Sequence, residues 1–332
     1  MDKKYVLALF LALLYLNPLL SKSDERIRDD GLLQAIASSA LEDIQSLLTE
    51  LPDVDAIYDD HTSFGTTLLG HAACSGRNDV IDLLINQGAK LRLKDEYIYD
   101  ALQKAVECNQ DDVLQHLLEQ SFYNDLEEDE LVNLLHIAIP NDHMPTFDIL
   151  LNQIPNYQNP SAYTDLLIVA ARHNQPTLFI HLHNLGANIY AKDQSGKKVI
   201  HWASNCPEIL QYLQENGEDL DALSNDKKNV LHFCVNTNAL IFLANAGVTI
   251  NLQDDKGWTA LHYAVADADV ELVEMLLKSG ADSALKTLES ETLIDFELEI
   301  VKGSKAIDIA NEALALQTNK KVDYQKIVDL LQ

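Results

Sequence analysis

Glycine and basic residues are scarce in this chain of 332 residues. Its 12 glycines are about half the share usual for this length. Lys and Arg number 24 against 52 Asp and Glu, so the formal net charge is −28. Such a charge repels phosphate backbones and anionic lipid, and we therefore expect no nucleic-acid partner and no membrane insertion by the mature chain.

Catalytic and metal-binding motifs are also missing from the sequence. There is no P-loop, Rossmann glycine run, G-x-S-x-G or H-E-x-x-H motif. The four cysteines form neither a disulfide framework nor a zinc-type cluster with histidine. An enzyme with an unrecognised active site stays the third and weakest hypothesis, and no cofactor is expected.

The first residues of the chain have the three parts of a secretory signal peptide. Lys3 and Lys4 precede an apolar run from Tyr5 to Leu16, and Ser21 and Ser23 supply small residues near its end. Even counted to Leu20, the run is shorter than the roughly 20 residues that cross a bilayer. We expect residues 1–23 to be removed and the mature protein to be periplasmic or secreted. A buried core helix or a short uncleaved anchor is the alternative.

The segment from Asp254 to Lys286 has the clearest internal pattern. Asp-x-x-Gly predicts a tight turn, Thr259-Ala260-Leu261-His262 opens a short helix, and apolar residues at helical spacing predict a second helix over Val270–Lys278. Gly280 then supplies a left-handed stop. This segment resembles one repeat of the ankyrin family.

The pattern recurs along the chain at intervals of roughly 33 residues, the length of an ankyrin repeat. Nine copies, several of them degenerate, extend from about residue 29 to the C-terminus. Those at Ile200-His201 and Leu231-His232 are two or three residues short between their helices. The sequence therefore predicts an all-α ankyrin-repeat solenoid over residues 24–332.

Two features depart from the repeat pattern. Ile98, Leu131, Tyr163 and Lys227 stand where the family prefers a turn glycine, which predicts irregular hairpins. An insertion at 288–302 separates the last two repeats. Residues Asp295–Ile300 alternate acidic and apolar side chains like a strand, whereas Ile294, Leu298 and Val301 also fall at helical spacing.

The resemblance implies that other proteins bind in a concave groove, through the turn tips and the exposed side of each first helix. Counting from the recurring histidine places Gln194, Ser195 and Lys197 at one tip, and Asp255, Lys256 and Trp258 at another. The residues expected to contact a partner are Trp258, Lys256, Phe64, Tyr97, Tyr99, Tyr163, Arg172, His173 and Asp267. Aromatics at projecting tips are typical interface anchors, and Trp258→Ala is expected to weaken binding without loss of stability. The alternative is a degenerate hairpin whose ring folds back onto its neighbour, in which case the ring is structural.

The histidines and cysteines have structural interpretations. His136, His201, His232 and His262 recur at one position per repeat, where the family uses a hydrogen-bonding residue, and they are too far apart to share a metal ion. Cys74 and Cys108 fall at the ends of adjacent first helices. Because packed helices lie about 10 Å apart, we expect free thiols rather than a disulfide.

The sequence thus predicts an exported, monomeric, non-catalytic scaffold that binds another protein. Glu96, Glu107, Asp129, Glu130, Asp255 and Asp267 fall on the expected binding face, which favours a partner with a basic surface. For these residues the alternative is a generally acidic protein whose solvated surface carries acidic side chains everywhere. The alternative is a cytosolic or host-delivered adaptor with the same fold.

Overall fold

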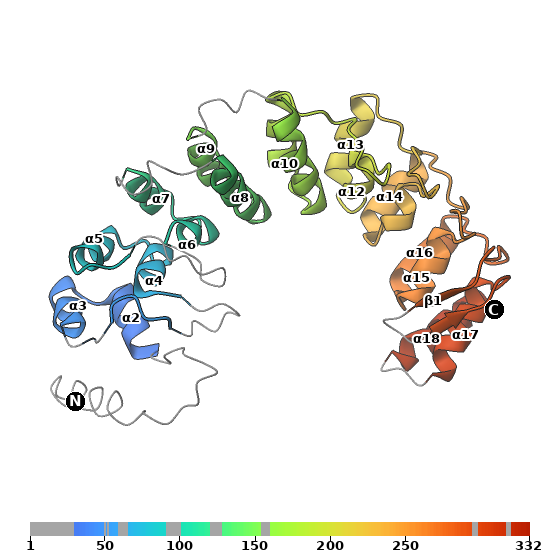
Figure 1. Ribbon diagram of the computed structural model, residues 1–332. Helices are drawn as coiled ribbons and strands as arrows, with labels where there is room; N and C mark the ends of the chain where they lie inside the picture. The colour runs from blue at the N-terminus through green and yellow to red at the C-terminus, as the bar shows by residue number, and fades with distance from the viewer. Residues whose placement is uncertain are drawn as a thin grey trace. The chain divides into compact units, whose positions relative to one another are not determined.

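The computed structural model describes residues 30–49, 51, 53–58, 66–90, 101–119, 128–153, 160–293, 298–316 and 320–332. The proposed signal peptide at 1–23 and the tip residues Phe64, Tyr97 and Tyr99 lie outside these residues. The chain divides into two compact units, Met1–Gln153 and Ile154–Gln332. Each unit is built from successive helix pairs (Figure 1).

The described part of unit 1 contains four helix pairs. They are α2 (Asp30–Ser38) with α3 (Leu41–Leu48), α4 (Leu68–Cys74) with α5 (Asn78–Asn86), α6 (Ala101–Glu107) with α7 (Asp111–Leu118), and α8 (Glu128–Ala138) with α9 (Met144–Leu151). A 3-10 turn, η2 (Ile139–Asn141), joins the last pair. The first helices contact one another in the order α2, α4, α6 and α8, as expected for a stack of repeats.

The described part of unit 2 contains five pairs. They are α10 (Pro160–Arg172) with α11 (Pro176–Asn184), α12 (Val199–Trp202) with α13 (Pro207–Glu215), η3 (Val230–Phe233) with α14 (Thr237–Asn245), α15 (Ala260–Ala266) with α16 (Val270–Lys278), and α17 (Ala306–Ala315) with α18 (Lys321–Leu331). First helices pack on first helices and second on second throughout the unit. The predicted repeat pattern is therefore confirmed.

The core lies between the two helix layers of each unit. In the repeat of α15 and α16, Ala264 and Val265 are buried on the first helix, and Leu272, Val273 and Leu276 are buried on the second. Small residues keep the first helix thin, so neighbouring repeats can approach closely. The two copies that are short between their helices have a four-residue α12 and a four-residue 3-10 turn η3 in place of a full first helix.

The unusual turn residues have two different outcomes. Lys227 adopts a left-handed φ of 60°, so it occupies the glycine position of a turn. Leu131 and Tyr163 instead lie inside α8 and α10, which begin before them. No turn with positive φ is needed there, and Pro160 is well suited to the first position of α10.

The insertion forms a β-hairpin. Strand β1 (Glu291–Leu293) pairs antiparallel with β2 (Leu298–Ile300), with Glu291 opposite Ile300 and Leu293 opposite Leu298. The strand interpretation is thus confirmed for 298–300, while 294–297 lie outside the described residues.

A disulfide joins the ends of α4 and α6 through Cys74 and Cys108, whose Cα atoms are 5.2 Å apart. The prediction of free thiols was wrong for this pair. A separation of about 10 Å applies to helix axes, and Cα atoms lie about 2.3 Å from the axis, so facing Cα atoms approach to about 5 Å. Cys206 and Cys234 are free and buried, and burial raises the pKa of each thiol to about 11.

Candidate partner-binding surface

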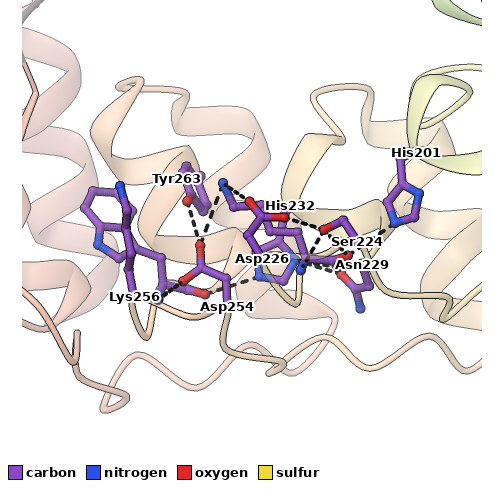
Figure 2. A network of polar contacts seen from close by, with 10 residues as sticks. His201, Ser224, Asp226, Asn229, His232, Asp254, Lys256 and Tyr263 are labelled. Carbon is purple, nitrogen blue, oxygen red and sulfur yellow. Dashed lines mark hydrogen bonds and ion pairs between the residues drawn. The ribbon is translucent and has the colours of Figure 1, made fainter. Parts of the chain in front are cut away.

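A polar network fixes the turn that precedes α15 (Figure 2). The buried Asp254 carboxylate accepts hydrogen bonds from the backbone N of Lys256 at 3.0 Å and of Trp258 at 2.8 Å. Its Oδ2 accepts the hydroxyl of Tyr263 at 2.7 Å. Asp193 and Ser224 occupy the same place in the two preceding turns and accept the backbone N of Lys197 at 2.9 Å and of Lys228 at 3.1 Å, respectively. A short polar side chain therefore closes each of these turns.

Successive turns are also hydrogen-bonded to each other. The backbone N of Asn225 donates to the carbonyl of Ser195 at 3.0 Å, and that of Asp255 donates to Asp226 at 3.1 Å. In the same way, the backbone N of Leu288 donates to the carbonyl of Lys256 at 2.7 Å. The tips of these repeats thus form a continuous backbone-linked row that holds their side chains in register.

The recurring histidines bind the turn of their own repeat, and His201 and His232 also bind the next repeat. In every case Nδ1 accepts a backbone N–H three residues earlier: Lys198 at 2.9 Å for His201, Asn229 at 3.2 Å for His232 and Thr259 at 3.1 Å for His262. The proton therefore resides on Nε2. His201 Nε2 donates to the carbonyl of Ala222 at 3.1 Å, and His232 Nε2 donates to that of Trp258 at 3.2 Å.

Burial lowers the pKa of all three of these histidines, to about 4 for His262. They are neutral structural residues at pH 7, as expected from the sequence. His136 is half-buried on α8. The described residues contain no cluster of three His, Cys, Asp or Glu side chains that could hold a metal ion.

Lysines and aromatic rings alternate along the first helices of unit 2. Lys197 Nζ lies 4.8 Å from the centroid of the Trp202 ring and 4.4 Å from that of Phe233. Lys228 Nζ lies 5.8 Å from the centroid of Phe233 and 4.8 Å from that of Tyr263. All five side chains are half-buried. We call Lys197, Trp202, Phe233, Lys228 and Tyr263 the lysine–aromatic column.

The two lysines of the column differ in their ionic partners. Lys228 Nζ is 3.3 Å from the carboxylate of Asp226 and 3.8 Å from that of Asp254. Lys197 forms no ion pair within 4.0 Å in the described part of the chain, although its backbone N–H is bound by Asp193. The ammonium of Lys197 is thus held by two rings and is not neutralised by a direct partner.

Comparison with known proteins identifies the fold family. The family model for ankyrin repeats in three copies matches residues 32–129 and 200–287, which is more than half of the chain. The chain belongs to the ankyrin-repeat family.

Several known ankyrin proteins are similar to part of this chain. It is 30% identical to "Ankyrin repeat domain-containing protein SAT10" of Stachybotrys chartarum over 49% of this chain and 8% of the relative. It is 31% identical to the "Nuclear factor NF-kappa-B p105 subunit" of Gallus gallus over 54% of this chain and 20% of the relative. Human "B-cell lymphoma 3 protein" is 32% identical over 42% of this chain and 32% of the relative. The chain thus spans less than a third of each of these relatives.

Two aromatic residues expected to contact a partner are buried instead. Trp258 has 0% exposure, and its ring centroid lies 4.9 Å from that of Tyr263. The ankyrin turn at Lys256 is covered by the chain at Leu288, so the ring folds back into the stack rather than projecting. Tyr163 is 8% exposed because it lies inside α10, and burial raises its pKa.

The other predicted contact residues are on the surface where they are described. Lys256 is exposed at its turn, and Arg172 and His173 are exposed at the end of α10. Asp267 is exposed at the end of α15, and partial desolvation of its carboxyl raises its pKa. Its carbonyl accepts Lys320 Nζ at 2.7 Å.

Sequence reasoning missed the rings of the lysine–aromatic column. Trp202, Phe233 and Tyr263 each follow the recurring histidine of their ankyrin repeat. The signal was present, because one aromatic residue occupies this position in three successive repeats. No helix in the described part of the chain is long and apolar enough to cross a membrane.

Proposed function

We propose that the protein is a non-catalytic scaffold that binds another protein through the turn tips and first-helix ends of unit 2. The observation that carries the proposal is the row of hydrogen-bonded turns beside the half-buried lysine–aromatic column. Fixed turns lower the entropy cost of binding, and half-exposed aromatic rings are frequent anchors at interfaces. Membership of the ankyrin family, whose repeats generally mediate protein–protein interactions, supports the same function.

Site-specific photo-crosslinking tests this function. A benzoyl-phenylalanine residue replaces Arg172 or Val235, both exposed at the ends of first helices, in cells that produce the protein. The matched control is Gln211, which is exposed on the second helix α13. We expect one discrete crosslinked band from Arg172 and Val235 and none from Gln211. Equal crosslinking from all three positions, or none from any, contradicts the proposal.

The partner is proposed to have a basic surface. The net charge of −28 supports this, because opposite charge accelerates diffusional association. With the crosslinked partner in hand, the association rate constant should fall at least about tenfold between 50 and 500 mM salt. A rate constant that does not change with salt contradicts a basic partner.

We also propose that the protein is exported. The apolar run after Lys3 and Lys4 supports this, and so does the Cys74–Cys108 disulfide, because stable disulfides are typical of oxidising compartments. The test is the intact mass of the protein in each cell fraction, after expression with its own first residues. A mass lacking residues 1–23 in the exported fraction is expected; full-length protein with reduced cysteines in the cytosol supports the adaptor alternative instead.

A further inference from the structure

The lysine–aromatic column has a local charge opposite to that of the whole chain. Lys197 and Lys228 contact the same ring of Phe233, and each also contacts one further ring. Only Lys228 is paired, with Asp226 and Asp254, among the residues that the structure describes. The column therefore presents one ammonium without an ion-pair partner within 4.0 Å, that of Lys197, between two rings. The carboxylate of Asp193 interacts with it electrostatically, but Asp193 Oδ1 is hydrogen-bonded by Ser195 and by the backbone N of Lys197.

The rings hold the Lys197 ammonium in place and leave its net charge available to a partner. An aromatic ring carries negative potential on its faces. Lys197 Nζ lies over the faces of Trp202 and Phe233, which attract and orient the ammonium without removing its charge. A carboxylate pairs with this ammonium, whereas an ammonium or guanidinium is repelled by it.

The spacing of the column sets the form of the partner. Stacked helices lie about 8 to 10 Å apart, so the rings of successive repeats recur at about that distance. An extended polypeptide advances about 3.1 to 3.4 Å per residue, so every third residue of the partner meets the next repeat.

We propose that the lysine–aromatic column binds an extended segment of the partner protein and that a Glu or Asp carboxylate of that segment pairs with Lys197 Nζ. This inference rests on the proposed function and names the chemistry of the bound segment. An acidic residue in the bound segment does not conflict with a partner that is basic overall. The net charges of the two proteins determine their attraction at long range, whereas Lys197 and one carboxylate pair only at contact distance.

Titration of the full-length chain with three peptides tests the proposal. The probes are acetylated and amidated peptides of four Pro-Pro-Glu triplets, four Pro-Pro-Gln triplets and four Pro-Pro-Lys triplets, because proline keeps each one extended. Binding is measured by calorimetry and by the indole N–H signals of the two tryptophans. We expect the Glu peptide to shift the signal of Trp202 and to leave that of the buried Trp258 unchanged.

Three variants connect binding to Lys197. Lys197→Met is expected to weaken binding of the Glu peptide about tenfold or more, as for loss of a charge-assisted hydrogen bond. Lys278→Met is the control outside the column, at an exposed lysine of the second helix α16 that is paired with Glu274, and is expected to weaken binding less than about threefold. Lys197→Arg retains the charge and also pairs with carboxylates and stacks on rings, so it should bind the Glu peptide more tightly than Lys197→Met does.

Several results would overturn the inference. They are equal losses for Lys197→Met and Lys278→Met, binding of the Gln or Lys peptide as tight as that of the Glu peptide, or no binding of the Glu peptide at about 1 mM. If these occur while crosslinking from Arg172 and Val235 persists, the scaffold function stands and only the acidic segment is wrong. Loss of that crosslinking contradicts the scaffold function itself.

Discussion

Trp258 occupies the same place in its repeat as Lys197 and Lys228 do in theirs. The lysines are half-buried over aromatic rings, whereas the indole is fully buried against Tyr263. A position that contacts solvent in two repeats is thus part of the core in the third, next to the inserted hairpin.

Truncation of this side chain should therefore destabilise the protein. We expect Trp258→Ala to lower the free energy of unfolding by about 3 to 5 kcal/mol, the usual cost of removing a buried tryptophan. Trp202→Ala is the control, because the half-buried ring of Trp202 should cost only about 1 to 2 kcal/mol. Urea denaturation of both variants provides the measurement. A loss below about 1 kcal/mol for Trp258→Ala would restore the tip interpretation.

The buried histidines give the stability a defined dependence on pH. Burial lowers the pKa of His262 from 6.5 to about 4, so the unfolded chain binds a proton before the folded chain does. Above pH 6.5 His262 contributes fully to the free energy of unfolding. This contribution declines as the pH falls and is lost near pH 4, where the total loss is about 3 kcal/mol. We expect the free energy of unfolding of His262→Gln to fall less steeply over this window. Parallel profiles of variant and wild type between pH 7 and pH 4 would contradict this assignment.

At the scale of the elements, the inserted hairpin lies close against the preceding turn. Gly257 has φ of 80°, and a Cβ at this position would lie 2.5 Å from the backbone N of Leu288. Gly280 has φ of 95° but no atom within 4 Å of the corresponding Cβ position. Comparing substitutions at the two glycines therefore distinguishes the cost of a left-handed backbone from the cost of a steric clash with Leu288.

Alanine substitution at these two glycines tests the contact with the hairpin. Gly280→Ala should cost about 1 to 2 kcal/mol through the left-handed backbone alone. Gly257→Ala should cost about 1 to 3 kcal/mol more, because the backbone at Leu288 must move. Thermal melts followed by circular dichroism compare the two variants. Equal losses mean that the hairpin is not fixed against the turn.

The disulfide between Cys74 and Cys108 is the covalent link between two repeats of unit 1. These residues are 34 positions apart in the sequence, and a closed loop of that length is worth about 3 to 4 kcal/mol in the chain-entropy model. We expect Cys74→Ser with Cys108→Ser to lower the stability of unit 1 by up to this amount. Peptide mapping without reductant checks the bond directly, and Cys206 and Cys234 should react with alkylating reagents only after denaturation. Free Cys74 in the native oxidised protein contradicts the prediction.

Most elements were predictable from sequence because burial in a repeat is a local pattern. The helix pairs and the role of His201, His232 and His262 follow from spacing within about 30 residues. The errors arose where a neighbouring element decides the outcome. The burial of Tyr163 and Leu131 depends on where α10 and α8 begin. The burial of Trp258 depends on the position of the chain at Leu288. Whether Cys74 and Cys108 form a disulfide depends on how closely two helices pack, and this distance cannot be predicted from the sequence pattern.

At the scale of the whole molecule, the division into two units predicts independent folding. Residues 154–332 contain five helix pairs and their own buried core, and their cysteines are free. We expect this fragment to melt cooperatively, with a midpoint that does not change on addition of reductant. The full chain should show a transition that does shift, because unit 1 contains the disulfide. A fragment that fails to fold would mean that unit 1 is required for the structure of unit 2.

The direction of the histidine bonds bears on how such a chain can change in length. His201 donates to the repeat that follows it, and so does His232, across 21 and 26 residues, respectively. Insertion or loss of one entire repeat by recombination leaves His201 and His232 each with an equivalent acceptor ahead of it. Insertion or loss of part of a repeat leaves the Nε2 donor of one histidine without its usual carbonyl acceptor. Viable descendants of this gene should therefore differ in length by whole repeats, and smaller insertions should occur where β1 and β2 lie, between complete repeats.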